Sequence, residues 1–471
     1  MFKLKLPKKF DFFLKEEKWQ LFKYQIEFLN NVESTLYQSF LISSDTGTGK
    51  TFTLFLPKLI EGLKNNNLKM IYISPLRSII SDIFDRLNYI KKSLGLEITI
   101  GKRTGDESSQ SKKKQIEDPV DILLTTPESL ALMITKKECD QIFLQTSYIA
   151  IDEINELINT KRGDQLILTL SVILNVNKKI KIFSSCSNLN NFKHISNWLN
   201  FNGKLKIIQN DYKKKINLEI FHLDNLPDYG HSADYALEKI SKMITNKKTI
   251  IFVNTRAQSE ILFKNLQLNY PNLKIGIYHS SLSRKVRDNT EKQMQNNQID
   301  SVISTSSLEM GIDWKNIDKI INIGAPKSIN RIIQRAGRSN HNYNGISESL
   351  LIPTNKFEYI ECHALKNLIL TNNCDEVIEK KGSKDVLCQH LLLISCRSSF
   401  NVNKEYSRII KNFPYRKLKK NDFKQIISFI FDGGYVLQKY EDYSKLKKLK
   451  NGNFIIKNEK LKKNILMNAG T

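Results

Sequence analysis

The sequence predicts an α/β fold in which two parallel-sheet domains are followed by a small winged-helix-like domain. Short apolar, β-branched segments recur along the chain, and a helix-like stretch follows each of them. Near-continuous apolar strands that alternate with helices are typical of parallel sheets covered on both faces. These segments form two series, and the pattern changes toward the C-terminus. We therefore expect three domains, at residues 1–210, 211–375 and 376–471.

The two series of expected strands are separated by a charged stretch near residues 210–233 that contains Pro and Gly. This stretch is interpreted as a linker or an inserted edge strand. The first series comprises residues 70–73, 122–125, 148–151 and 180–183, and the second comprises residues 249–253, 275–278, 301–304 and 319–322.

The last part of the chain has a different pattern. Residues 387–395 and 422–431 are predicted to be helical, and two glycines at 433–434 then interrupt the chain. Asn-Gly-Asn at 451–453 is typical of a hairpin turn within residues 445–457. Two helices followed by a hairpin suit a winged-helix module.

The charge balance favours an anionic partner. The 471 residues include 73 Lys and Arg against 48 Asp and Glu, which gives a net charge of +25. Such an excess points to a polyanion, usually nucleic acid. A composition rich in Lys and Asn, inherited from an AT-rich genome, is the alternative explanation, and charge alone does not separate the two.

Cysteine usage and apolar runs bear on the cellular compartment. None of the six Cys form a CxxC pair, which argues against zinc knuckles and a thioredoxin motif. Scattered thiols favour a reducing cytoplasm. The apolar runs are far shorter than a membrane span, and the N-terminus does not resemble a signal peptide, so no membrane contact is expected.

A phosphate-binding loop is predicted at residues 44–51, which read SDTGTGKT. The run fits the pattern GxxxxGK[ST] except that Ser44 replaces the first Gly. Glycines let backbone N–H groups curl around phosphates, while Lys50 supplies charge near the β- and γ-phosphates and Thr51 offers a hydroxyl to Mg²⁺. The nucleotide-binding residues expected here are Asp45, Thr46, Gly47, Thr48, Gly49, Lys50 and Thr51.

An acidic pair ends the expected strand at 148–151. Asp152 and Glu153 follow it directly, and the carboxyl end of a parallel strand faces the nucleotide crevice. Asp152 can hold Mg²⁺ and Glu153 can polarise the attacking water. Two adjacent acids are common by themselves, but about 100 residues after such a loop they favour a hydrolytic role.

The second domain contributes arginines. Arg335 and Arg338 lie three residues apart in a helix-like stretch that begins near Ile329, so both are expected on one helix face. Such a pair can neutralise charge on a γ-phosphate held by the other domain. A solvated basic face is the alternative.

Nine motifs follow one another along the chain: Gln25, SDTGTGKT (44–51), PLR (75–77), TGD (104–106), TTPES (125–129), DEIN (152–155), NTR (254–256), TSSLEMGID (305–313) and QRAGR (334–338). In this order they resemble a superfamily 2 DEXH-box helicase. The longer phrases PLRSI (75–79), RTGD (103–106), TTPESL (125–130), DEINEL (152–157) and HSSLSR (279–284) resemble more narrowly the large helicase-related (Lhr) family. VLCQHL (386–391) and DGGYVLQKYEDY (432–443) are similar to its ligase-associated branch. The resemblance covers nearly the whole chain, although family members continue further, so the chain is expected to be truncated.

The resemblance implies two RecA-like domains and a winged helix that together form an ATP- and Mg²⁺-dependent helicase. Such an enzyme would move 3′ to 5′ on single-stranded or partly duplex DNA, or on an RNA–DNA hybrid, in DNA repair, with a repair ligase or nuclease as partner. By resemblance, Gln25 would read adenine, and Gly311 and Asp313 would flank the nucleotide. The residues expected to be catalytic are Lys50, Asp152, Glu153, Gln334, Arg335 and Arg338, and those expected to hold the metal are Thr51 and Asp152. The residues expected to contact nucleic acid are Arg77, Thr126, Asn254, Thr255 and Thr305.

Two motifs depart from the family. Asn155 stands where the family has His, a residue that would link hydrolysis to the second domain, with Gln334 as a candidate partner. Ser-Cys-Ser at 185–187 replaces the usual Ser-Ala-Thr, and Ser187 would keep one hydroxyl. Coupling is therefore less secure than hydrolysis, which leaves two alternatives: a nucleic-acid-binding remnant that has lost coupled ATPase activity, and a helicase directed at RNA or a hybrid.

Overall fold

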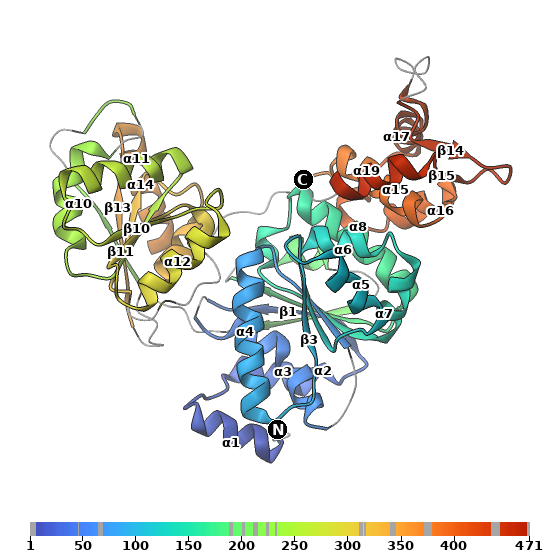
Figure 1. Cartoon of the computed structure of the whole chain (residues 1–471), viewed down its shortest axis with the longest axis horizontal. Coiled ribbons are helices and arrows are strands. Elements are labelled where there is room, and N and C mark those ends of the chain that lie inside the picture. Colours follow the sequence, from blue (N-terminus) through green and yellow to red (C-terminus); the bar gives the residue numbers. More distant parts are fainter. Residues whose placement is uncertain are drawn as a thin grey trace.

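The structure, a computed structural model, consists of two sheet domains and a smaller helical domain (Figure 1). Domain 1 holds the first sheet, domain 2 the second, and domain 3 the C-terminal helices with a short hairpin. The structure describes residues 6–45, 47–64, 69–187, 192–199, 203–210, 215–222, 226–230, 233–309, 314, 317–339, 345–371, 379–434 and 443–468.

Domain 1 is built on a seven-stranded parallel sheet with strand order β3-β4-β2-β5-β6-β1-β7. Successive residues of β1 point to opposite faces: Leu41 joins one apolar core, and Phe40 and Ile42 join the other. The strands are β1 (Tyr37–Ser43), β2 (Lys69–Ile73), β3 (Ile100–Arg103), β4 (Ile122–Thr125), β5 (Thr146–Ile151), β6 (Lys181–Cys186) and β7 (Lys204–Gln209).

Helices cover both faces of this sheet. Side chains from α1 to α4 build one core, and those from α6 to α9 contribute to the other. The helices are α1 (Lys8–Glu16), α2 (Lys23–Val32), α3 (Lys50–Gly62), α4 (Arg77–Leu94), α5 (Ser109–Glu117), α6 (Pro127–Met133), α7 (Asp140–Gln145), α8 (Lys161–Val176) and α9 (Lys193–Trp198).

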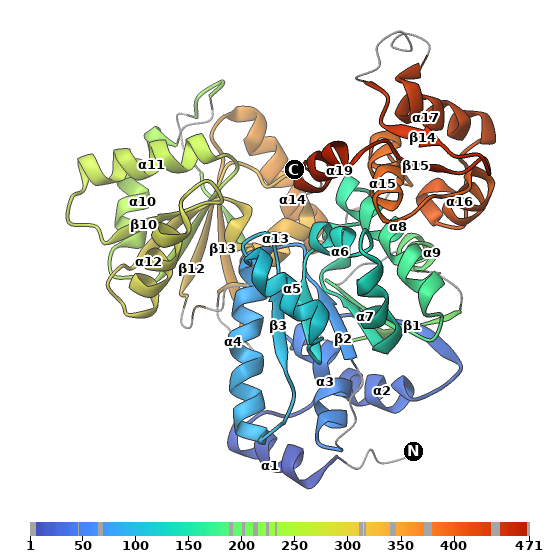
Figure 2. The same cartoon turned by 45° about the vertical axis from the view of Figure 1, so that its right-hand side comes forward.

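Domain 2 is a six-stranded parallel sheet with strand order β10-β11-β9-β12-β13-β8. Its strands are β8 (Ile216–Ile220), β9 (Thr249–Val253), β10 (Ile275–Tyr278), β11 (Ser301–Ser304), β12 (Lys319–Ile323) and β13 (Ser347–Ile352). Its helices are α10 (Leu237–Ile244), α11 (Arg256–Asn269), α12 (Arg284–Gln295), α13 (Ile329–Ala336) and α14 (Lys356–Leu370). Figure 2 shows α13 on the side of domain 2 that faces domain 1.

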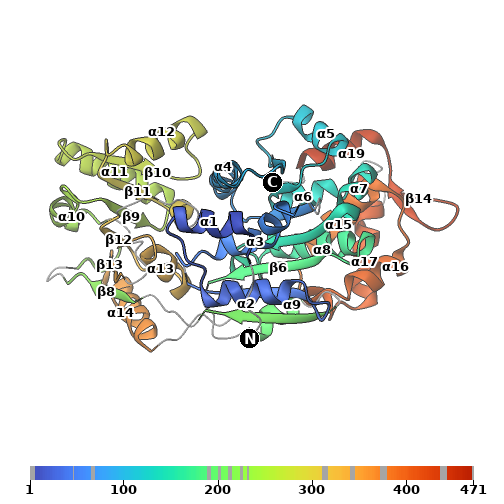
Figure 3. The same ribbon diagram turned by 90° about the horizontal axis from the view of Figure 1, so that it is seen from below.

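Domain 3 has helices α15 (Lys384–Arg397), α16 (Val402–Ile409), α17 (Lys420–Asp432) and α19 (Glu459–Asn468), with a hairpin of β14 (Leu446–Lys448) and β15 (Phe454–Ile456). An antiparallel bridge between Phe400 and Phe454 adds a third segment to the hairpin. α15 packs against α8 of domain 1 (Figure 3), and one apolar core runs through both domains.

The fold class predicted from the sequence is confirmed. All eight expected strands are present, the two predicted C-terminal helices correspond to α15 and α17, and the expected turn joins β14 to β15. The stretch at 210–233, interpreted as a linker or an inserted edge strand, contains β8, which is an edge strand of the second sheet. The sequence did not mark β3, β7, β13 or α16. The chain passes from the first sheet to the second between β7 and β8, inside the expected linker.

Candidate nucleotide site and nucleic-acid interface

The phosphate loop lies between β1 and α3. Gly49 precedes the helix with a φ of 81°, a left-handed conformation that glycine adopts without strain. Ser44, the residue that departs from the loop pattern, shares a hydrogen bond of 2.6 Å with the Thr48 hydroxyl. Thr48 Oγ1 in turn donates to the Asp45 carbonyl over 2.7 Å. These contacts brace the loop from inside. Thr46 lies outside the described residues.

Gln25 lies against this loop although it comes from α2. Its side chain is 2% exposed, and Nε2 donates to Thr53 Oγ1 of α3 over 2.9 Å. Its Oε1 accepts from the Phe22 backbone N–H over 2.9 Å, which fixes the amide at the start of α2. A Cβ added to Gly49 would come within 3.2 Å of Gln25 Nε2. The expected adenine-reading role stays a prediction.

The acidic pair meets the loop across the sheet edge. Lys50 Nζ lies 3.1 Å from Glu153 Oε1, and Thr51 Oγ1 donates to Asp152 Oδ2 over 2.9 Å. Lys50 is 5% exposed and the Glu153 side chain 13%, so this ion pair is shielded from water. The cation that would bind phosphate is therefore neutralised by the carboxylate that would orient water.

Asp152 is held by neighbouring strands. Tyr72 of β2 donates its hydroxyl to Asp152 Oδ2 over 2.6 Å, and Ser185 of β6 donates to Asp152 Oδ1. Burial, reinforced by Asp152, raises the pKa of Tyr72 well above its usual value, so the phenol stays a donor. Ser185 Oγ also accepts from the Glu153 N–H over 3.0 Å. Glu153 adopts a φ of 45°, rare for a non-glycine residue and typical of functional sites.

These contacts correct one expectation about the Ser-Cys-Ser segment. The hydroxyl that meets the acidic motif belongs to Ser185. Ser187 Oγ is buried and has no hydrogen-bond partner among the described residues. Sequence reasoning also missed Tyr72, whose position one residue before the end of β2 is the signal that could have found it.

The donor set suits Mg²⁺. Thr51 and Asp152 present a hydroxyl and a carboxylate to the same point, and Mg²⁺ prefers such oxygen ligands together with phosphates and water. Within the described part of the chain, no group of three or more His, Cys, Asp or Glu forms a separate metal-binding cluster.

The arginines of domain 2 are gathered around Glu309. Arg335 is 1% exposed, with Nη2 2.6 Å from Glu309 Oε1 and Nη1 donating to Asn322 Oδ1 over 3.1 Å. Arg338 Nε donates to the Glu309 carbonyl over 3.2 Å. The expectation that one helix carries both is wrong, because α13 ends at Ala336 and Arg338 lies in the following turn. Gly311 and Asp313 lie outside the described residues.

A hydrogen bond crosses between the two sheet domains beside the acidic pair. Gln334 Nε2 of α13 donates to Glu156 Oε1 over 3.1 Å. Asn155 Nδ2 donates to the same oxygen over 3.1 Å. The expected link from Asn155 to Gln334 therefore passes through Glu156, which sequence reasoning did not single out although it follows the DEIN motif directly.

The expected nucleic-acid contacts follow strand ends in both sheets. Thr126 caps α6 after β4, and Thr255 caps α11 directly after Asn254 at the end of β9. Thr305 follows β11. Arg77 begins α4 after β2, and its Nη1 lies 3.1 Å from Asp106 Oδ1 with both side chains about half exposed. In each sheet these residues share the carboxyl edge, and their roles stay predictions.

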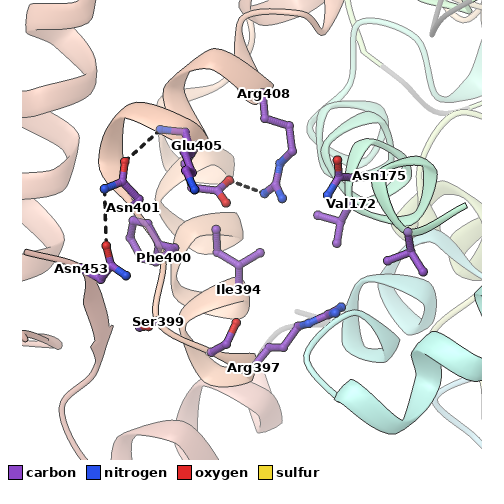
Figure 4. Close-up of a pocket in the computed structure, with 13 residues that line it drawn as sticks. Val172, Asn175, Ile394, Arg397, Ser399, Phe400, Asn401, Glu405, Arg408 and Asn453 are labelled. Atoms are coloured by element: carbon purple, nitrogen blue, oxygen red, sulfur yellow. Dashed lines mark hydrogen bonds and ion pairs between the residues drawn. The ribbon is translucent and has the colours of Figure 1, made fainter. Parts of the chain in front are cut away.

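A cavity of about 320 Å³ lies elsewhere, between the C-terminal end of α8 and domain 3 (Figure 4). The two arginines that line it have acidic partners, since Arg397 pairs with Asp140 and Arg408 with Glu405. The start of α8, near the acidic pair, is about 20 Å away along the helix. The cavity thus belongs to the joint between domains 1 and 3 and not to the nucleotide site.

Comparison with known proteins bears on the domains. Residues 22–195 match the model of the DEAD/DEAH box helicase, residues 235–342 the helicase conserved C-terminal domain, and residues 368–471 the winged helix domain of the large helicase-related protein. The chain is 31% identical over 459 residues to the ATP-dependent helicase Lhr-Core of Methanocaldococcus jannaschii, covering 92% of this chain and 53% of that protein.

Solved structures share the fold. Mycobacterium smegmatis helicase Lhr bound to single-stranded DNA and AMP-PNP superposes with a TM-score of 0.85 at 21% identity, covering 98% of this chain and 61% of that one. The DUF1998 helicase MrfA bound to DNA gives a TM-score of 0.75 at 17% identity, with the same coverage of 98% and 61%. The chain spans about half the length of the curated Lhr-Core relatives it matches. Among the described helices, none is long and apolar enough to cross a membrane.

Proposed function

We propose that this chain, which belongs to the Lhr family of superfamily 2 helicases, is the motor part of an ATP-driven translocase on single-stranded DNA. The observation that carries the proposal is the contact between the phosphate loop and the acidic pair. Lys50 with Glu153 and Thr51 with Asp152 meet at the carboxyl edge of the first sheet, where a nucleotide binds in open α/β folds.

Hydrolysis follows from this arrangement. Backbone N–H groups of the loop and Lys50 bind the β- and γ-phosphates, which displaces Glu153 from its ion pair and frees it to orient the attacking water. Thr51 and Asp152 would hold Mg²⁺, which would offset negative charge on the phosphates. Tyr72 and Ser185 fix the Asp152 carboxylate, and Arg338, with Arg335 beside it, comes from domain 2 to the γ-phosphate.

Movement along nucleic acid uses the two sheets in turn. Thr126 and Arg77 in domain 1, and Thr255 and Thr305 in domain 2, grip the phosphate backbone without reading bases. When ATP closes the cleft, the backbone contacts of the two domains come closer together, and hydrolysis separates them. The resemblance to the family supports a 3′ to 5′ direction.

The cellular role is part of the same proposal. We infer a function in DNA repair, together with a ligase or nuclease, from the resemblance to the ligase-associated branch. A cytoplasmic location is supported by the five described cysteines, all of which are free thiols.

The test is ATP hydrolysis by the purified chain with Mg²⁺, with and without single-stranded DNA, at low and moderate salt. We expect several-fold stimulation that weakens as salt rises, because phosphate contacts are salt-sensitive. Lys50→Ala is expected to lower turnover by about 100-fold, because the cation that would stabilise the transferring phosphate is lost. Tight DNA binding with no stimulation would instead favour the remnant alternative.

The same assay separates DNA from RNA. Single-stranded RNA and an RNA–DNA hybrid serve as competing activators at equal nucleotide concentration. Contacts to the phosphate backbone distinguish these polymers weakly, so the substrate is identified by which polymer activates ATP hydrolysis most. Stronger activation by RNA than by DNA would overturn the DNA assignment and leave the motor assignment intact.

A further inference from the structure

Glu156 is the residue of the hydrolysis segment that reaches domain 2. Its Oε1 accepts two hydrogen bonds of 3.1 Å, one from Asn155 beside it and one from Gln334 in α13. Gln334 is 1% exposed, so the contact across the domain boundary is shielded from water. Asn155 Oδ1 is buried and has no hydrogen-bond partner among the described residues. Asn155 thus supports Glu156 and does not itself bridge the domains.

The surroundings of Glu156 are costly for a carboxylate. Burial raises the pKa of Glu156, the hydrogen bond from Gln334 opposes this, and the carboxylates of Glu153 and Glu309 raise it further. Arg331 of α13 is the nearby cation that counters them. A largely buried carboxylate among other acids depends on its hydrogen bonds, because an unpaired buried charge is strongly unfavourable.

Glu156 is connected by hydrogen bonds both to the acidic pair of domain 1 and to α13 of domain 2. It ends a single 3₁₀ turn (Ile154–Glu156), and its backbone N–H donates to the Glu153 carbonyl over 2.9 Å. On the other side, Gln334 is followed directly by Arg335, which is fixed to Glu309. A displacement of α13 is therefore transmitted through one carboxylate to the residue that orients water.

We propose that Glu156 is a positioning residue that couples domain closure to hydrolysis, in the place that the family resemblance gives to the residue at 155. This inference rests on the proposed motor function. It makes the Asn155 departure tolerable, since the bridge needs an acceptor for the Gln334 amide and a donor beside it, and Glu156 and Asn155 supply these.

The experiment exchanges the two partners. Gln334→Glu places two carboxylates at hydrogen-bond distance, and Glu156→Ala removes the acceptor; each is expected to lower the stimulation of ATP hydrolysis by single-stranded DNA about tenfold. The double variant Glu156→Gln with Gln334→Glu restores a donor and an acceptor with the roles reversed. We expect it to recover most of the stimulation lost in Gln334→Glu. Glu97→Gln, at an exposed acid of domain 1, is the matched control and is expected to behave like the wild type.

A purely structural role would leave the stimulation of ATP hydrolysis by DNA unchanged in Glu156→Ala. Hydrogen exchange of α13 and of residues 154–158 supplies a readout that does not need activity: both segments should exchange faster in Glu156→Ala and return toward wild type in the double variant. Full stimulation in Glu156→Ala, or a double variant no better than Gln334→Glu, would overturn the inference. A wild-type chain that DNA does not stimulate would refute the motor function, while the exchange data would still decide whether Glu156 joins the domains.

Discussion

Domains 2 and 3 both adjoin domain 1, but the chemistry of the two junctions differs. At the junction with domain 3, apolar side chains of α8 and α15 belong to one continuous core, and Arg397 of α15 pairs with Asp140 of α7. At the junction with domain 2, Gln334 donates a hydrogen bond to Glu156. The first junction is apolar with ionic support, whereas the contact seen at the second is polar.

This difference indicates where the molecule moves. Separating an apolar interface exposes its area to water at about 25 cal/mol per Å², so domains 1 and 3 are expected to move as one body. A hydrogen bond can be exchanged for one with water at a net cost of only about 1 kcal/mol. The proposed nucleotide cleft lies at the second junction, so the polar contact is placed where the proposed motor has to open and close.

Leu391→Ala is expected to have the largest effect on stability at the junction between domains 1 and 3. Leu391 of α15 is fully buried in the shared core, and truncation of a buried Leu costs about 2–5 kcal/mol. We expect urea unfolding to show this loss as one transition that involves both domains. Leu370→Ala, at a residue 69% exposed on α14, is the control and should change stability by less than about 0.5 kcal/mol. Early, separate unfolding of domain 3 in the wild type would contradict the one-body view.

Arg397→Ala removes the ionic part of the same junction. The two side chains are 17% and 27% exposed, so the change leaves the Asp140 carboxylate partly buried and unpaired, at a cost of about 1–3 kcal/mol. Unfolding of both single variants and the Arg397→Ala/Asp140→Ala pair gives the coupling. Arg416→Ala, in a more exposed pair with Glu379, should cost less than about 1 kcal/mol. Equal losses at the two sites would show that burial does not matter here.

A nucleotide should distinguish the two junctions directly. We expect a non-hydrolysable ATP analogue with Mg²⁺ to slow hydrogen exchange in α13 about tenfold, equivalent to roughly 1.4 kcal/mol, because closure orders the cleft. α15 should be unaffected. The same experiment on Lys50→Ala, which is expected to weaken phosphate binding, is the control. Equal protection of α13 and α15 would place the moving junction elsewhere.

The sequence predicted the parts of this molecule that depend on local pattern. The apolar, β-branched segments that alternate with helix-like stretches predicted the central strands. The loop at 44–51 and the acids at 152–153 were found because both lie at strand ends. The edge strands β3 and β7 escaped because half-exposed residues interrupt their apolar pattern.

Residues that act through tertiary contact could not be found in this way. Tyr72 looks like one more apolar strand residue until β5 places Asp152 beside it. Glu156 looks like a solvated acid until α13, 178 positions away, supplies Gln334. The role of Glu309 could not be predicted from the sequence, because only the fold places Arg335 and Arg338 against it.

The smallest expected effect concerns one carboxyl at the junction with domain 3. Asp164 of α8 is 6% exposed, and its Oδ2 accepts from the Ser383 N–H over 2.8 Å. Burial raises the pKa of Asp164, so the folded protein binds this proton more tightly than the unfolded chain. The stability that this carboxyl contributes is therefore present below its ordinary pKa and is lost as pH rises through the raised value.

Asp164→Asn keeps an acceptor for Ser383 and removes the titration. It should consequently be more stable than the wild type by up to about 1 kcal/mol at about pH 7.5, with the advantage vanishing near about pH 4. Urea unfolding at the two pH values measures this, with the exposed Asp118→Asn as control. A gain that is the same at both pH values would mean that packing, and not the buried charge, distinguishes the variant. A loss at neutral pH would mean that the charge strengthens the bond to Ser383 enough to outweigh its burial, and the junction with domain 3 would then share the polar character of the junction with domain 2.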